Sequence, residues 1–263
     1  MKTAIISDIH SNPAALEKVI SDAKNHGCDK FLCLGDIVGY GYDPNTCIDI
    51  CRRENIFCLM GNHDAGLVGR LSLDWFNAFA REGVVRQRGV VSDGDRKWLD
   101  SLPYKHIEDR TDSFATAFAH GTYDFPERFE YISYACDAAF EVSSLKQDRI
   151  RALFVGHTHC ANVYMVDENY NVSETYLGLD TVEPIDLTKN LVSIVNVGSC
   201  GYPRNQPYTI YCIYDDEKKT ATHRILEFDF DDYCKKMAAA NIEIPLWVKS
   251  REKEAEERRI GWR

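Results

Sequence analysis

Short runs rich in Val, Ile, Leu and Phe recur along the chain, and most of them stop at a polar cluster. Runs of this length and composition are typical of buried strands. The pattern predicts six such strands, over residues 3–7, 30–34, 56–60, 114–119, 151–155 and 192–197. Because each run is closed by polar residues, the ends of these strands are where candidate functional residues gather.

Helical patterns lie between the early strands. Apolar residues in segment 12–26 recur at intervals of three and four, with Asn12 as a helix N-cap and Pro13 in the first turn. Segment 45–54 follows the same pattern between the second and third strands. Alternation of strand, helix and strand requires crossover connections, so we expect a layered α/β fold.

The second half of the chain has a different pattern. Short polar turns separate four further strands, which indicates a more antiparallel region at 162–167, 172–179, 208–215 and 221–230. A mostly helical insertion at about 65–103 carries an apolar stripe formed by Trp75, Phe76, Phe79 and Ala80. We expect a charged helical tail at about 231–263. Without an internal repeat or a linker, residues 1–263 are predicted to form one domain.

Charge and composition narrow the function. The 263 residues include 31 basic and 41 acidic side chains, a formal net charge of −10, which disfavours long duplex nucleic acid as a partner. No stretch approaches about 18 uninterrupted apolar residues, so no membrane span is expected. The first apolar run is too short for a signal peptide, and the ten cysteines form no C-x-x-C pair. We therefore predict a cytoplasmic protein with buried thiols.

Metal-binding residue types gather at the ends of the predicted strands. In layered α/β folds, ligands bind at the carboxyl ends of strands. Carboxylate and imidazole ligands together favour Mn²⁺, Fe, Zn²⁺ or Ni²⁺ over Ca²⁺. Along an extended segment, alternate residues point to the same side and can reach one ion. The clusters are Asp8-Ile9-His10, Gly35-Asp36, Gly61-Asn62-His63-Asp64, His120-Gly121 and Gly156-His157-Thr158-His159.

Histidine is concentrated in these clusters. Five of the eight histidines of the chain lie in them, and a set of that size beside several carboxylates indicates a metal site more than structural histidines. His26, His106 and His223 lie elsewhere, and we expect them to be structural or surface residues.

The ordered motifs D-x-H, G-D, G-N-H-D, H-G and G-H-T-H resemble the calcineurin-like metallophosphoesterase superfamily over residues 8–159. The flanking segments resemble its small bacterial phosphodiesterase or diadenosine-tetraphosphatase-like branch. The resemblance implies an α/β fold in which two packed mixed β-sheets are flanked by helices, a four-layer αββα sandwich. One departure is Gly39-Tyr40, where many members carry a further acidic residue.

The same resemblance implies two divalent or mixed-valence metal ions (Mn, Fe, Zn or Ni) and no organic cofactor. Asp36 would bridge the ions. Asp8, His10 and His159 would complete one site, and Asn62, His120 and His157 the other. His63 would protonate the leaving oxygen or stabilise the phosphoryl group, with Asp64 orienting its ring; Asp64 as a turn-capping acid is the alternative.

Other residues near the motifs could contact substrate. Asn12 could reach it or simply cap its helix. Arg204 could hold a phosphate or be a surface arginine, and Tyr40 could stack on a base or line the entrance. In the helical insertion, Arg70 is the candidate for a distal phosphate.

These features predict a binuclear metal-dependent hydrolase of phosphate esters that uses a metal-bridging hydroxide, and a phosphodiesterase in particular. A dinucleoside-polyphosphate or nucleotide hydrolase and a phosphoprotein phosphatase are alternatives, and a non-catalytic binding scaffold of the same fold is an alternative of another class. The expected partner is a small phosphate ester or nucleotide. The native substrate, the physiological metals and the oligomeric state stay open.

Overall fold

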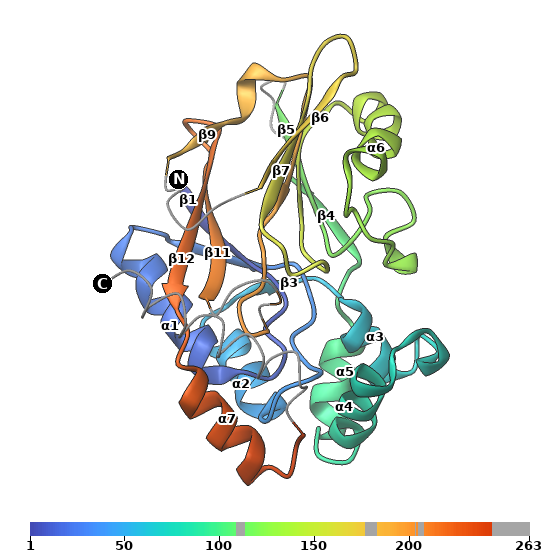
Figure 1. The fold of residues 1–263 in the computed structure, drawn as a ribbon, viewed down its shortest axis with the longest axis vertical. Coiled ribbons are helices and arrows are strands. Elements are labelled where there is room, and N and C mark those ends of the chain that lie inside the picture. The colour runs from blue at the N-terminus through green and yellow to red at the C-terminus, as the bar shows by residue number, and fades with distance from the viewer. Residues whose placement is uncertain (109–113, 177–182, 203, 205–207, 244–263) are drawn as a thin grey trace, which may run out of the picture.

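Two mixed β-sheets pack face to face in a computed structural model that describes residues 1–108, 114–176, 183–202, 204 and 208–243 (Figure 1). Six strands of the described chain form the first sheet, in the order β3 (Phe57–Cys58), β2 (Lys30–Cys33), β1 (Lys2–Ile6), β11 (Tyr208–Asp215), β12 (Thr220–Glu227) and β9 (Ile185–Asp186). Six more form the second, in the order β4 (Lys105–Glu108), β5 (Ala115–Ala119), β6 (Ile150–Val155), β10 (Val192–Asn196), β7 (Asn162–Val166) and β8 (Val172–Tyr176).

Each sheet has a parallel part and an antiparallel part. In the first sheet β1 pairs parallel with β2 and antiparallel with β11, and in the second β6 pairs parallel with β5 and β10. The parallel strands β1, β2 and β3 come from the strand–helix alternation of the early chain, and β5, β6 and β10 are the parallel strands of the second sheet. The antiparallel strands predicted in the second half are β7, β8, β11 and β12.

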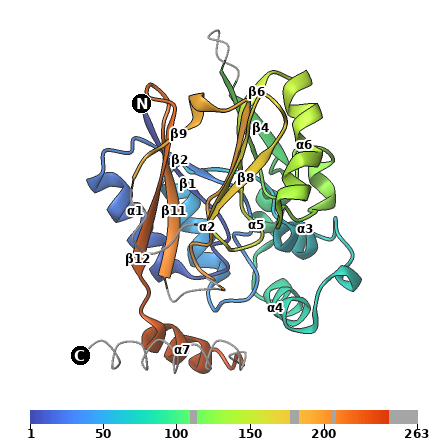
Figure 2. The same cartoon turned by 45° about the horizontal axis from the view of Figure 1, so that its top comes forward.

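Helices cover the outer faces of both sheets. On the first sheet α1 (Pro13–Asn25) packs against β11 and the neighbouring α2 (Pro44–Arg53), and on the second α6 (Ala135–Gln147) lies along β6, β7, β8 and β10 (Figure 2). Between the sheets lie the rings of Phe118, Phe154 and Tyr214, with centroids 5.5 Å and 5.2 Å apart in successive pairs. The predicted four-layer αββα architecture is therefore confirmed.

The first two helices begin where the sequence predicts. The Asn12 side chain accepts a hydrogen bond from the backbone N–H of Ala15 at 3.3 Å, and Pro13 occupies the first helical turn. Both devices satisfy or remove amide donors that a helix start leaves without partners. On α2, Asp43 caps the helix in the same way.

Among the strands and α-helices of the described residues, three were not predicted: β4, β9 and α6. Helix α6 places Glu141 on its buried face, so its apolar stripe is interrupted. The Glu141 carboxylate accepts hydrogen bonds from the backbone N–H groups of Tyr123 and Asp124, which satisfy it inside the protein. A carboxylate on the inner side hides the helical period that hydrophobic patterning detects.

The insertion at 65–103 contains the predicted helices, namely α3 (Asn62–Val68), the 3₁₀ turn η1 (Leu73–Trp75), α4 (Ala78–Arg88) and α5 (Asp93–Asp100). Its apolar stripe is not uniform, because Ala80 is buried while Trp75 is 83% exposed. After β12 comes α7 (Phe230–Ala239), and the remainder of the predicted tail, 244–263, lies outside the described residues. The division into one domain stays a prediction. Among the helices that the structure describes, none is both long and apolar enough to cross a membrane.

The loops that leave the parallel strands are bonded to one another across the sheets. Beyond β1 and β2, the backbone N–H of Asp8 donates to the carbonyl of Gly35 at 3.1 Å. The N–H of Cys200, which follows β10, donates to the carbonyl of Ser7 at 2.9 Å and so joins the second sheet to the first. Gly156 lies at the same junction, where a Cβ would come within 1.9 Å of the Ser7 hydroxyl. The carboxyl ends of both sheets therefore converge on one small volume.

Candidate metal centre and its cavity

The converging loops bring all seven predicted metal ligands together. Asp8 and His10 follow β1, Asp36 follows β2, Asn62 begins α3, His120 follows β5, and His157 and His159 follow β6. Six of them are at most 5% exposed, and Asn62 is half-buried. Buried carboxylates and imidazoles are stable only when they are paired or bind a cation.

Three sets of donor atoms lie within 4.8 Å of one another among the described residues. The sets are Asp8, His10 and His159; His10, Asp36 and His63; and Asp36, His120 and His157. The first and third sets share no residue, and together they contain six of the seven predicted ligands. The seventh, Asn62, places its Oδ1 3.2 Å from Nε2 of His120.

Two imidazoles are oriented with their Nε2 atoms toward each other. His10 donates from Nδ1 to the carbonyl of Val38 at 3.0 Å, and His159 donates from Nδ1 to the carbonyl of Tyr202 at 2.5 Å. If both rings are neutral, these bonds leave a lone pair on each Nε2. The two Nε2 atoms are 3.0 Å apart, and that of His159 is 3.2 Å from Oδ1 of Asp8. Facing lone pairs repel unless a cation lies between them, so the donor set fits a metal ion.

His120 and His157, in the other half of the cluster, lie next to the two carboxylates. Nε2 of His120 lies 3.4 Å from Oδ2 of Asp36. The backbone N–H of His157 donates to Oδ2 of Asp8 at 3.0 Å, and its ring stacks on Tyr131 with centroids 3.8 Å apart and planes at 10°. Within the described chain, Oδ1 of Asp8 is a buried atom without a hydrogen-bond partner. That orphaned oxygen also fits a bound cation.

The pKa values in the cluster follow from burial and from the two carboxylates. Burial lowers the pKa of His157 to about 3 and holds that of His10 well below its ordinary value, so both rings are neutral. Burial also lowers the pKa of His120, but Asp36 and Asp8 together raise it by more, so that the pKa is about 9. Burial raises the pKa of Asp36, yet the neighbouring His120 and His63 lower it well below its usual range. Without a cation, His120 therefore holds a proton between carboxylates.

The backbone of the cluster is strained. Asp8, His10, Asp36, His157 and His159 all have positive φ, between 47° and 65°. This region is unfavourable for side chains other than glycine and is common where function dictates the conformation. The positive φ values direct these side chains, which come from several loops, toward the same small region. Extended alternation, which predicted that Asp8 and His10 share a side, does not describe the local backbone.

Asp64 does not orient His63, and this corrects the sequence interpretation. Its carboxylate accepts four backbone hydrogen bonds, from Asp36 at 2.8 Å, Ile37 and Gly61 at 3.0 Å, and Val38 at 3.2 Å. Burial and the Asp36 charge raise the pKa of Asp64 to about 7, while backbone N–H groups oppose the rise. The alternative of a turn-capping acid is the correct one: Asp64 clamps the turn that carries Asp36.

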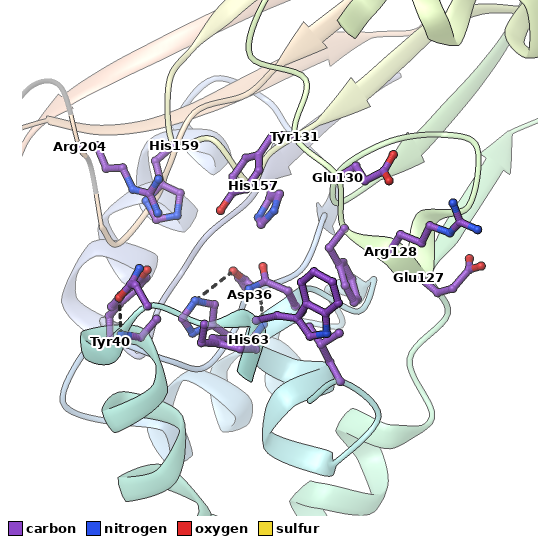
Figure 3. A pocket seen from close by; sticks show the side chains of 17 residues that line it. Asp36, Tyr40, His63, Glu127, Arg128, Glu130, Tyr131, His157, His159 and Arg204 are labelled. Carbon is purple, nitrogen blue, oxygen red and sulfur yellow. Dashed lines mark hydrogen bonds and ion pairs between the residues drawn. The ribbon is translucent and has the colours of Figure 1, made fainter. Parts of the chain in front are cut away.

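His63 lies at the edge of the cluster. Its backbone N–H donates to Oδ1 of Asp36 at 2.8 Å, and its Nε2 lies 4.0 Å from Oδ2 of the same residue (Figure 3). Its Nδ1 is buried and makes no hydrogen bond within the described residues. Burial lowers the pKa of His63 to about 4, opposed by the Asp36 charge. The ring is therefore neutral. The Asp64 carboxylate is bonded to backbone N–H groups and does not stabilise the charged form of the His63 ring.

A cavity of about 640 Å³ opens beside the cluster. Its lining includes Asp36, Asn62 and His63, and two of the predicted substrate contacts, Tyr40 and Arg204. Burial lowers the pKa of Arg204, but the neighbouring Tyr40 and Tyr131 raise it by more than burial lowers it. The guanidinium therefore stays charged. Figure 3 shows Arg204 and Tyr40 at one end of the cavity and Glu127, Arg128 and Glu130 at the other.

The other two predicted substrate contacts lie elsewhere. Both polar ends of Asn12 are used, since its carbonyl caps α1 and its amide donates to the carbonyl of Gly201 at 3.0 Å. Arg70 does not line the described cavity, and its guanidinium binds the side chain and carbonyl of Asp100 at 2.6 Å and 2.7 Å. In this arrangement both side chains are bonded to other parts of the protein, and their contact with substrate stays a prediction.

Sequence reasoning missed one wall of the cavity. Trp75, Phe76 and the segment 127–131, with Tyr131 stacked on His157, line it. Trp75 and Phe76 were assigned to an apolar stripe, and segment 127–131 carries no motif. The apolar residues next to the G-N-H-D motif were the available signal.

Known proteins resemble this chain in sequence. A model of the calcineurin-like phosphoesterase family matches residues 1–161. An uncharacterized protein of Methanocaldococcus jannaschii is 34% identical over 251 residues, which are 94% of this chain and 96% of that protein.

Two crystal structures resemble most of the chain. A metallophosphoesterase from Sphaerobacter thermophilus aligns with a TM-score of 0.78 and 33% identity, over 95% of this chain and 97% of that one. A hypothetical protein from Pyrococcus horikoshii OT3 shares the fold, with a TM-score of 0.71 and 16% identity, over 94% and 96% of the two chains.

The Asp64 clamp gives a stability prediction. In Asp64→Asn the remaining oxygen still accepts hydrogen bonds from two backbone N–H groups. The new NH₂ group is a donor, so the other two N–H groups lose their acceptor. Because unsatisfied buried donors each cost about 1–3 kcal/mol, we expect the free energy of unfolding to fall by about 3 kcal/mol in urea titrations. Asp74→Asn, at an exposed side chain, is the control and should change it by less than about 0.5 kcal/mol. An Asp64→Asn protein as stable as the control would contradict the clamp.

Proposed function

The chain belongs to the calcineurin-like phosphoesterase family, and we propose that it is a phosphodiesterase whose buried Asp and His cluster holds two divalent cations. The observation that carries the proposal is the pair of donor sets, Asp8–His10–His159 and Asp36–His120–His157, which share no residue and lie at one edge of a cavity. The facing Nε2 atoms and the orphaned Asp8 oxygen support cations there.

Each side chain of the cluster has a role in this proposal. Asp8, His10 and His159 would hold one ion, Asn62, His120 and His157 the other, and Asp36 would contact both. Bound there, two divalent cations neutralise phosphate oxygens and lower the pKa of a water molecule so that hydroxide is available at neutral pH. Mixed oxygen and nitrogen donors favour Mn²⁺, Fe, Zn²⁺ or Ni²⁺ over Ca²⁺.

Arg204 and the two tyrosines beside it would bind the phosphate. The guanidinium is charged and half-buried, and it lies at the cavity end nearest Tyr40 and His159 (Figure 3). Arginine offers a planar pair of N–H donors that fits two phosphate oxygens. Tyr40 and Tyr131, which raise its pKa, offset the effect of its burial.

The shape and charge of the cavity favour a diester over the alternatives. Its volume of about 640 Å³ extends on both sides of Asp36 and has room for two substituents on one phosphate. The far end carries Glu127 and Glu130, whose charges disfavour the further phosphates of a dinucleoside polyphosphate. A scaffold without turnover would keep several strained, buried charged residues without using them.

His63 would act on the leaving oxygen. The free ring is neutral, and a phosphate anion bound beside it would raise its pKa so that the ring takes up a proton from solvent. The imidazolium would then give its Nε2 proton to the leaving oxygen and return to the neutral form. Asp36 holds the backbone of His63 in place through Oδ1. Because His63 also lies in a donor set with His10 and Asp36, binding of a cation by His63 is the competing role.

Metal-dependent hydrolysis tests the proposed activity. Purified protein loaded with Mn²⁺ should cleave bis(p-nitrophenyl) phosphate, lose activity on chelation, and regain it with Mn²⁺ but poorly with Ca²⁺, measured as nitrophenolate release. Preferred cleavage of monoesters over diesters would contradict a phosphodiesterase. Full activity after verified removal of metal would contradict the metal-dependent mechanism.

Paired kinetics separate the two roles of His63. General acid catalysis contributes about 10²–10⁴-fold, so His63→Asn should lower kcat by at least about 10²-fold on an alkyl diester, whose leaving group needs a proton. On a p-nitrophenyl ester, which leaves readily without one, the loss should be much smaller. His26→Asn, at an exposed ring just after the end of α1, is the matched control and should not change either rate.

Metal analysis on the same samples completes the test. The His63→Asn protein should retain the metal content of the wild type. Equal losses on both esters would indicate phosphate positioning instead of proton donation, and loss of an ion would indicate that His63 is a ligand.

A further inference from the structure

Trp75 projects from the protein although it belongs to an apolar segment. Among the described residues it is the most exposed large apolar side chain, at 83%, followed by Phe140 on α6 at 80%. Exposure of an indole is unfavourable in water, because aromatic rings are among the side chains that gain most from burial. Unlike Phe140, Trp75 lines the cavity beside the metal cluster.

The 3₁₀ turn η1 holds the indole in this position. Ser72 caps the turn, accepting from the N–H of Asp74 at 3.3 Å, and the N–H of Phe76 donates to the carbonyl of Leu73 at 3.2 Å. Leu73 and Phe76 pack over Gly66 of α3, where a Cβ would meet them at 3.2 Å and 2.9 Å. Residues on both sides of Trp75 are therefore anchored to the core while its ring is left outside.

This apolar wall reaches the reacting end of the cavity. The ring of Phe76 contacts that of His63 edge to face, with centroids 5.2 Å apart and planes at 80°. A phosphate beside His63 would thus have Phe76 and then Trp75 along one side. A substituent of that phosphate would lie against the wall.

Another part of the cavity wall is acidic. Glu127 and Glu130 line it, and Arg128, whose guanidinium carbon lies 4.5 Å from the ring centroid of Phe125, reduces but does not cancel their charge (Figure 3). Such a wall repels a second phosphate and accepts hydrogen bonds from N–H groups. In a cavity lined by both an indole and carboxylates, a flat ring is favoured over an aliphatic chain or an anion.

We propose that Trp75 is a specificity-determining residue that stacks on an aromatic ring carried by the ester substituent of the substrate. The ring chemistry is shared by nucleobases and plain aryl groups, and the acidic wall would favour a ring with N–H donors. This inference rests on the proposed phosphodiesterase function, because it needs a phosphate at the metal cluster.

Three phosphonates that cannot be hydrolysed at the P–C bond test the ring contact without turnover. They are ethoxymethylphosphonate and the same molecule with a phenyl or an adenin-9-yl ring on its terminal carbon. Dissociation constants come from calorimetry on the Mn²⁺-loaded protein. Stacking on an aromatic side chain is worth about tenfold or more per ring, so the ring-bearing ligands should bind at least about tenfold tighter than the ring-free one.

Variants assign that preference to the indole. Trp75→Ala should remove it and leave the Kd of the ring-free phosphonate unchanged, whereas Trp75→Phe should retain most of it. Phe140→Ala, at an equally exposed ring away from the cavity, is the control and should change nothing. A preference that persists in Trp75→Ala would overturn the proposal.

The ligands also distinguish a nucleobase from a plain aryl group, and failure of the Trp75 proposal from failure of the phosphodiesterase proposal. Tighter binding of the adenine compound would identify a nucleobase, and equal binding a plain aryl group; both support stacking. Ring-free binding without any gain from a ring would overturn the Trp75 proposal and leave the phosphodiesterase intact. If no phosphonate binds, the phosphate site fails and the Trp75 proposal fails with it.

Discussion

Two carboxylates and four imidazoles are buried within one small volume, and their mutual electrostatics govern the rest of this end of the molecule. Burying charge is costly unless partners compensate it. Here the compensation within the protein is incomplete, because the Nε2 atoms of His10 and His159 face each other and His120 must hold a proton between carboxylates. Two cations would replace that proton and separate the facing lone pairs.

The surrounding structure keeps these groups from moving apart. Carbonyls of Val38 and Tyr202 fix two imidazoles, and Tyr131 stacks on a third. Asp64 clamps the turn of Asp36 through three of its backbone N–H groups and also accepts from that of Gly61. Loops from both sheets are hydrogen-bonded across the junction, so packing of the two sheets sets the spacing of the cluster. The αββα architecture thus matters to function because it brings the carboxyl ends of strands from two sheets to one place.

Strand ends made much of this predictable from sequence. Each ligand motif follows a buried apolar run, and runs of that kind reveal both the strand and the edge at which it ends. The four-layer fold followed from the same motifs. The sequence does not show backbone conformation at these ends, where positive φ turns Asp8 and His10 into the cluster. The sequence also does not show which groups a carboxylate binds. Asp64 was therefore assigned to its neighbour His63, although it accepts hydrogen bonds from the turn at residues 36–38. Helix α6 and the projecting Trp75 were missed for a related reason, since Glu141 interrupts one apolar stripe and η1 breaks the other.

The central claim is that Asp36 joins two cation sites built from the separate donor sets. The most direct measurement is anomalous X-ray diffraction from crystals of the Mn²⁺-loaded protein, collected at the manganese edge. The account predicts two anomalous peaks, one beside Asp8, His10 and His159 and one beside Asn62, His120 and His157, both within coordination distance of the Asp36 carboxylate. A single peak at full loading, or two peaks of which one does not contact Asp36, would contradict it.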